Sequence, residues 1–146
     1  MSIIICPNCK SLLHQIEKTV RCENGHSFDF SKEGYLNLIL ANQKKKNNSG
    51  DNKIMLNARD AFLSTGHYDF LIDNIESALH SFDLFSTTKD GMIQLLDLGC
   101  GTGYYTRNIF KQKNLKKIGI DISKIGIAKA SIKDKDSTYL VGSAFN

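Results

Sequence analysis

Apolar residues at helical spacing mark the middle of the chain. Leu71, Ile75 and Leu79 recur at every fourth position, and acidic, amide and small side chains fill the positions between them. This spacing places an apolar stripe along one side of a helix, so we expect a helix over 68–82 with one buried face. A second, shorter helix is expected at 54–64.

The last third of the chain has a different pattern, in which apolar runs alternate with helical segments. The apolar runs are 92–98, 117–122 and 138–141, and the helical segments between them are 104–111 and 124–133. Apolar runs of this length joined by helices are typical of strands that are buried in a parallel sheet. The sequence therefore predicts an α/β fold for this part of the chain.

The first forty residues have the pattern of a small β-rich module. Turn signals, of which Asn24-Gly25 is the clearest, separate short apolar stretches at 20–40. Residues 41–53 contain no hydrophobic side chain after Ala41, so neither a helix nor a strand could bury a face there, and we expect a flexible linker. The predicted organisation is a module at 1–40, a linker at 41–53, a helical connector at 54–90 and part of an α/β domain at 91–146.

Three strands and two helices cannot cover both faces of a parallel sheet. We therefore expect the sequence to be the front of a longer protein and, taken alone, to be catalytically silent. We also expect the first forty residues to close their own core and to fold apart from a loosely packed, aggregation-prone remainder.

Composition and charge exclude several classes of protein. Of the 146 residues, 41% are hydrophobic and 23% are charged, which is typical of a soluble globular chain and not of a disordered one. No apolar run is long enough to span a bilayer, so we expect a cytoplasmic protein without a membrane partner. Basic residues prevail at both ends of the chain, but a net charge of +4 is only weak support for a polyanionic partner.

The cysteines near the start of the chain have the spacing of metal ligands. Cys6 and Cys9 form a C-x-x-C pair, and Cys22 and His26 supply a second corner after an interval of twelve residues. Two such corners complete a tetrahedral site of sulfur and nitrogen ligands, which suits Zn²⁺. Because four protein ligands leave no place for water, the predicted zinc ion is structural.

Two alternatives to this zinc site stay open. The C-x-x-C pair could be a redox pair, although such pairs belong to a thioredoxin-like βαβ setting that this segment lacks. His14 lies between the two corners and could replace His26 as the fourth ligand.

A second group of residues follows the apolar run at 92–98. Asp97 ends this run, and the glycine loop that follows, residues 99–103, has glycine at each alternate position. Glycines there allow a sharp turn and a close approach of the backbone to a ligand. Neither the dinucleotide pattern G-x-G-x-x-G nor the phosphate-binding loop G-x-x-x-x-G-K-[ST] fits these residues.

The acidic residues around the glycine loop indicate which ligand it holds. Asp97 suits a ligand with a positive charge, such as the ammonium and sulfonium groups of S-adenosylmethionine. Asp121 closes the next strand and is placed to accept hydrogen bonds from ribose hydroxyls. The alternative interpretations are a plain tight turn and a helix cap at Asp121. Cys100 has no neighbouring base in the sequence, so we interpret it as a packing residue and not as a nucleophile.

Taken together, these motifs resemble a known family over the whole chain. The resemblance is to the bacterial 23S rRNA (guanine-N1)-methyltransferases, a zinc ribbon followed by a Rossmann-like class I methyltransferase domain. Its motifs are the Cys6-Pro7-x-Cys9 pair, Cys22 with Gly25-His26-x-Phe28-Asp29, the segment 32–38, the segment 58–68 and the run 97–106. Thr102 departs from the acidic residue that some relatives carry at this position.

This resemblance implies an activity, a cofactor and a partner. The activity is methylation of N1 of a guanine in a hairpin of 23S ribosomal RNA by S-adenosylmethionine, with the zinc ribbon aiding RNA recognition. The residues expected at the cofactor are Tyr68, Asp97, Gly99, Gly101, Thr102, Gly103, Asp121 and Ile122. For Tyr68, simple core packing is an equal alternative, and no catalytic residue is identified.

Two other function classes remain open at this point. One is a non-enzymatic zinc-ribbon RNA-binding protein with a vestigial α/β part. The other is a class I methyltransferase with a protein or small-molecule acceptor. The sequence also leaves the oligomeric state open, a homodimer included.

Overall fold

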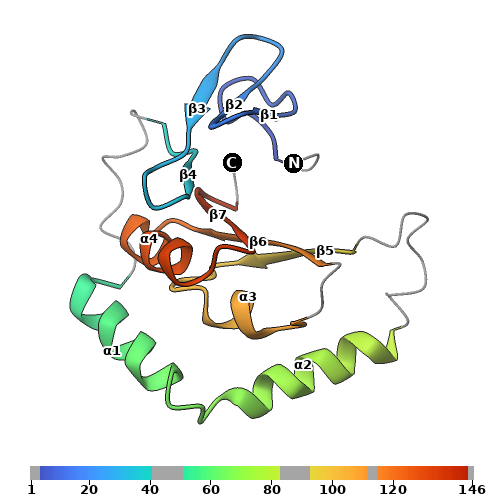
Figure 1. Ribbon diagram of the computed structural model, residues 1–146, viewed down its shortest axis with the longest axis vertical. Helices are drawn as coiled ribbons and strands as arrows, with labels where there is room; N and C mark the ends of the chain where they lie inside the picture. The colour runs from blue at the N-terminus through green and yellow to red at the C-terminus, as the bar shows by residue number, and fades with distance from the viewer. Residues whose placement is uncertain (1–3, 41–50, 83–92, 112–114, 145–146) are drawn as a thin grey trace.

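In the computed structural model, which describes residues 4–40, 51–82, 93–111 and 115–144, a parallel sheet separates a small β-rich module from a layer of helices. Figure 1 shows the N-terminal module (residues 4–40) on one side of the sheet and the helices on the other. The mixed α/β architecture predicted from the hydrophobic pattern is confirmed. No helix in these ranges is both long and apolar enough to cross a membrane.

The N-terminal module is built on a three-stranded antiparallel sheet. Its strands β1 (His14–Ile16), β2 (Thr19–Arg21) and β3 (Ser27–Asp29) each have only three residues and are paired in the order β1-β2-β3. Strands this short bury very few side chains, and Val20 is the one fully buried residue among them. The module therefore depends on other contacts for its stability.

The parallel sheet contains the three predicted strands and a strand from the β-rich segment 20–40 whose place in this sheet was not predicted. Strands β5 (Ile93–Leu98), β6 (Leu115–Asp121) and β7 (Thr138–Val141) match the three apolar runs to within two residues. The additional strand, β4 (Leu36–Asn37), comes from the N-terminal module and pairs in parallel with β7. The resulting order is β4-β7-β6-β5, so β4 covers the edge of β7 that the three-strand prediction left open.

The N-terminal module and the parallel sheet share one hydrophobic core. Cys6, Leu13 and Val20 of the module are fully buried in the same cluster as Ile118 of β6 and Leu140 of β7. This finding differs from the expectation of a module that closes its own core. The physical reason is that the β-rich unit has too few apolar side chains, so it completes its core with the apolar face of the sheet.

That apolar face is only partly covered. The N-terminal module lies over β6 and β7, while Leu96 and Leu98 of β5 point to the same face and stay 50% and 59% exposed.

The helices lie where the apolar periodicity places them, with one exception. Helix α1 (Lys53–Leu63), helix α2 (Asp69–Ser81) and helix α4 (Lys124–Lys133) match the predicted segments to within one residue. Helix α3 (Tyr104–Asn108) ends three residues earlier than predicted.

The early end of α3 follows from packing. Phe110 has a positive φ of 42° and is buried in a cluster with Ile72 of α2 and Ile109. Its backbone N–H donates a hydrogen bond of 2.6 Å to Glu76 of α2. These contacts turn the chain away from the helical path. No local pattern in the sequence predicts them.

Candidate functional site

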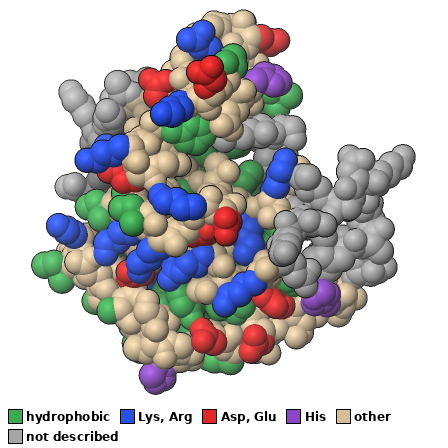
Figure 2. Space-filling model, viewed as in Figure 1, with side chains coloured by type: hydrophobic (Ala, Val, Ile, Leu, Met, Phe, Trp, Pro, Cys, Tyr) green, Lys and Arg blue, Asp and Glu red, His purple; other side chains and the backbone are tan. Residues whose placement is uncertain are grey.

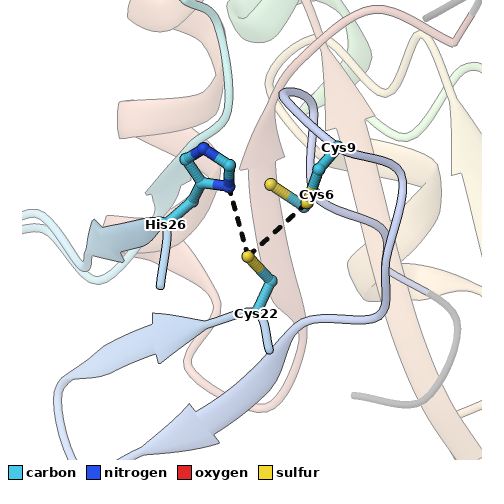
Figure 3. A group of neighbouring side chains, drawn as sticks. All are labelled: Cys6, Cys9, Cys22 and His26. Carbon is cyan, nitrogen blue, oxygen red and sulfur yellow. Dashed lines mark hydrogen bonds between the residues drawn. The ribbon is translucent and has the colours of Figure 1, made fainter. Parts of the chain in front are cut away.

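Four potential metal ligands meet at one point in the N-terminal module. Figure 3 shows Cys6 and Cys9, from one loop, facing Cys22 and His26, which lie at the end of β2 and the start of β3. Their ligand atoms all lie within 4.8 Å of one another. The structure thus brings together the predicted set and leaves His14 outside it, exposed on β1.

The distances in this cluster fit a tetrahedral zinc site. The Sγ atoms of Cys9 and Cys22 are 3.6 Å apart, and Cys22 Sγ lies 3.3 Å from Nδ1 of His26. Zn–S bonds of about 2.3 Å at tetrahedral angles place two sulfur ligands about 3.8 Å apart. All four cysteines lie in the described part of the chain and are free thiols, so no disulfide competes for these sulfur atoms.

The electrostatics of the cluster favour metal binding by two of its thiols. Hydrogen bonding to Asn24, with a further contribution from Ser11, lowers the pKa of Cys9 to about 5. Burial opposes ionisation of Cys22, but its hydrogen bonds with His26 outweigh this effect and lower its pKa. Because the thiolate is the form that binds a metal, the lowered pKa values of Cys9 and Cys22 favour metal binding by these two ligands.

The glycine loop borders an open space at the carboxyl ends of β5 and β6. Gly99 and Gly101 have positive φ values of 79° and 55°, and a Cβ atom built on either would meet no atom within 4 Å. The loop is fixed at its start because Gly99 N–H and Cys100 N–H both donate to the carbonyl of Ile120 on β6. A ligand can therefore approach the backbone at these two glycines without steric hindrance.

Asp121 connects the glycine loop to the next helix. One carboxylate oxygen accepts a hydrogen bond from Gly101 N–H at 2.9 Å, and the other accepts one from Ser123 N–H at 2.7 Å. A carboxylate can accept further hydrogen bonds, so a ligand hydroxyl can still bind there. Asp121 thus connects the glycine loop to the start of α4, although the N-cap of this helix is Ser123 and not Asp121.

Asp97 also has an intramolecular partner. Its Oδ2 accepts a hydrogen bond of 2.5 Å from the hydroxyl of Thr106, which is fully buried on α3. This bond orients the carboxyl group and leaves Oδ1 available to a cationic ligand.

The third glycine of the loop serves packing and not ligand access. A Cβ atom at Gly103 would lie 2.7 Å from the Tyr139 hydroxyl and 2.8 Å from Cβ of Ala130. Helix α4 contributes another glycine of this kind, because a Cβ atom at Gly126 would lie 2.8 Å from the carbonyl oxygen of Gly101. Sequence reasoning missed Gly126, and a glycine one turn after the Ser123 cap was the signal available for it.

The remaining predicted residues have mixed surroundings. Tyr68 precedes α2 and is 38% exposed, and its ring packs against Phe62 and Phe70, with centroids 5.7 and 5.9 Å away. Thr102 is 4% exposed, so its side chain is buried behind the loop. Ile122 is half-buried beside Asp121.

Cys100 has the properties of a packing residue, as expected. Burial is the main cause that raises the pKa of its thiol, and the nearby carboxylates of Asp97 and Asp121 add to the effect. A thiol with a raised pKa remains protonated and is a poor nucleophile.

Two family models match separate parts of the chain. Residues 4–47 match the model described as "RlmA, N-terminal", a zinc ribbon, and residues 89–141 match a "Methyltransferase domain". The first match contains all four residues of the metal cluster, and the second contains the glycine loop and Asp121.

Named relatives are similar to the chain over most of its length. A "23S rRNA (guanine(748)-N(1))-methyltransferase" of Streptomyces fradiae is 29% identical over 86% of the chain. A "putative 23S rRNA (guanine-N(1)-)-methyltransferase" of Bacillus subtilis is 33% identical over 96% of the chain, and one of Micromonospora griseorubida is 30% identical over 86%.

The chain spans about half the length of these relatives, since the matched parts cover 43%, 49% and 46% of them, respectively. The order of the two family models agrees with the order of parts seen in the structure, a Cys/His module followed by a parallel sheet. The chain is therefore similar to the N-terminal half of 23S rRNA (guanine-N1)-methyltransferases, and its two parts match a zinc ribbon and a methyltransferase domain.

Proposed function

We propose that the protein to which this chain belongs transfers a methyl group from S-adenosylmethionine to N1 of a guanine in 23S ribosomal RNA. The observation that carries the proposal is the open space beside Gly99 and Gly101 at the carboxyl ends of two parallel strands, with Asp121 at its side. Ligands of open α/β sheets bind at this edge. The names of the relatives support the choice of acceptor.

The residues at this edge fit the cofactor chemically. Asp97 has one carboxylate oxygen available for the ammonium group of S-adenosylmethionine, and Asp121 can accept hydrogen bonds from the ribose. When bound, the cofactor supplies an electrophilic methyl group on a positively charged sulfur atom. The task of this part of the protein is to hold that methyl group in a fixed direction, because methyl transfer depends on alignment more than on acid or base strength.

The zinc ion has a structural role in this proposal. Four protein ligands close the coordination sphere, so the zinc ion acts on the sheet only through the core that the module and the sheet share. Cys6 and Cys22 belong to the same buried cluster as Leu36 of β4 and Leu140 of β7. Zinc thereby stabilises the edge of the sheet as well as the N-terminal module.

The charge distribution supports an RNA partner. Figure 2 shows Lys and Arg side chains gathered across the face where α4 lies, between the N-terminal module and α1. Helix α4 and the turn after it carry Lys124, Lys129, Lys133 and Lys135. A basic face beside the cofactor loop suits a phosphate backbone, and we propose that the zinc ribbon extends this face toward the RNA.

The test uses the full-length protein with unmodified 23S rRNA. We expect methyl transfer from S-adenosylmethionine, and a methyl group on N1 of guanine blocks base pairing, so reverse transcription will stop at the modified base. Calorimetry is expected to show cofactor binding by the wild type and loss of affinity in Gly101→Ala. Gly34→Ala is the matched control, because Gly34 also has a positive φ and lies in the N-terminal module. Equal binding by all three proteins, or methylation of a protein or small molecule in place of RNA, would contradict the proposal.

A further inference from the structure

The face of the parallel sheet opposite the helices carries an apolar groove beside the N-terminal module. It is lined by Leu96 and Leu98 of β5, by Ile5 and Pro7 of the module, and by residues 142–144, which follow β7. None of its lining residues is charged. A volume of about 180 Å³ is enough for a large apolar side chain, so the groove suits an apolar occupant.

Strand β5 is apolar on both of its faces but is covered on one face only. Leu95 packs in the cluster that α2 and α3 form on the helix side. Leu96 and Leu98, on the other face, stay 50% and 59% exposed, whereas Ile118 on the neighbouring strand β6 is 6% exposed under the module. Strands with apolar residues on both faces are typical of sheets that are covered on both sides.

The order of the strands indicates where a continuing chain can join the sheet. Within the described ranges, β5 has no partner along its outer edge. At the opposite end of the sheet, β4 pairs with β7 and is also bridged to Phe30, so that edge is already occupied. The outer edge of β5 is therefore the place for a further strand.

The direction of the connections indicates which face the chain must cross to reach that edge. Helices α3 and α4 each join neighbouring strands on the helix side of the sheet (Figure 1). A single-helix connection of the same hand that returns from β7 to the far side of β5 runs on the opposite face, which is the face with the groove. The chain leaves β7 close against this face, because a Cβ atom at Gly142 would lie 3.1 Å from Cδ1 of Ile120.

We propose that the groove holds the connection that follows β7, an amphipathic helix of the C-terminal half of the protein, and that this helix leads to a strand paired with β5. The relatives offer enough chain for it, since the matched parts cover only 43% to 49% of them. Because Ile5 and Pro7 line the groove, the helix also contacts the N-terminal module and joins it to the later half. The inference concerns assembly and does not depend on the cofactor or the acceptor.

A tethered segment fits this surface better than a second copy of the chain. A stable dimer buries about 800 Å² on each partner, and two exposed leucines beside a small groove offer much less. A segment of the same chain needs no such area, because its tether gives it an effective concentration of about millimolar.

The first test places the photo-crosslinker p-benzoylphenylalanine at Leu98 of the full-length protein. Ile132 is the control position, since it is 61% exposed on α4, on the helix side of the sheet. Zinc content and circular dichroism show whether each variant is folded. Mass spectrometry should find crosslinks within one chain from position 98 to the first helix after residue 146, and none to this helix from position 132.

The second test measures the stability of Leu96→Ala and Leu98→Ala in the full-length protein. Leu12→Ala is the matched control, because Leu12 is 46% exposed and lies outside the groove. If the groove is filled, each of the first two variants should lower the urea midpoint by about 0.5 M or more, as substitutions of buried leucines do. The control should shift it by about 0.2 M or less.

Three results would overturn the inference. Crosslinks from position 98 to a second chain, with a urea midpoint that rises with protein concentration, would show a dimer interface. Crosslinks to a segment other than the first helix after residue 146 would refute the argument from strand order. Absence of crosslinks, with equal midpoints for Leu98→Ala and Leu12→Ala, would show that the groove is open to solvent. Failure of the full-length protein to methylate RNA would refute the proposed function alone, because neither test measures activity.

Discussion

Substitution of Asp121 by asparagine tests the connection between the glycine loop and α4. Both carboxylate oxygens accept backbone hydrogen bonds, from Gly101 at 2.9 Å and from Ser123 at 2.7 Å. Asparagine has the same shape but only one acceptor oxygen, so its NH₂ group must face one of these N–H donors. One of the two hydrogen bonds is lost, and the other is no longer made to a charged group.

The expected cost follows from these two changes. Hydrogen bonds to a charged group contribute about 1.5 to 3 kcal/mol each, and an N–H group left without an acceptor costs a similar amount when it is buried. Asp121 is half-buried, so we expect a loss of about 1 to 2 kcal/mol in the free energy of unfolding, at the lower end of this range. Cofactor affinity should fall by about 5- to 30-fold or more, because the bound state requires the same loop conformation and loses a ligand contact as well.

The measurements are urea unfolding of the full-length protein without cofactor and calorimetric titration with S-adenosylmethionine. Asp136→Asn is the control, since it makes the same change of charge at an exposed position in the turn before β7. Equal stability of the Asp121→Asn and Asp136→Asn variants would refute the structural part of the reasoning. A normal affinity in a destabilised Asp121→Asn variant would refute the link between loop and ligand.

Three further predictions concern zinc, packing and pH. Cys22→Ala should unfold the N-terminal module and also raise the rate of hydrogen exchange at the edge of the parallel sheet, because the module and the sheet share a core. Elemental analysis that finds no zinc in protein purified without chelator would rule out a dependence of this core on zinc. Gly126→Ala should weaken cofactor binding by displacing the carbonyl of Gly101, while its effect on zinc content should be nil. The hydrogen bond to Asp69 raises the pKa of Tyr104 to about 12 from the usual 10.0. Its neutral form therefore adds stability that is complete below pH 10 and is lost as the pH rises to about 12, so Tyr104→Phe should show a smaller decline over this interval in urea titrations.

Much of this molecule is determined by local patterns in its sequence. The metal cluster could be predicted from ligand type and spacing, because two short turns present Cys6, Cys9, Cys22 and His26 to one another. Helices and buried strands follow from apolar periodicity, which is why their bounds agree to within two residues in most cases. The turn conformations of Gly99 and Gly101 could likewise be anticipated, since a loop between a buried strand and a helix requires residues that tolerate positive φ.

Tertiary structure alone decided how these parts join. Two residues, Leu36 and Asn37, form a strand only because β7 offers an open edge and Leu36 becomes fully buried there. Asp60 pairs with Lys133 because α1 lies against α4, and Phe110 ends α3 because its backbone N–H donates to Glu76 of α2. Each of these features depends on a contact between residues far apart in the sequence, and the energy of such a contact is gained only when the sheet is assembled. Periodicity and spacing describe only neighbours along the chain, so they do not predict these contacts.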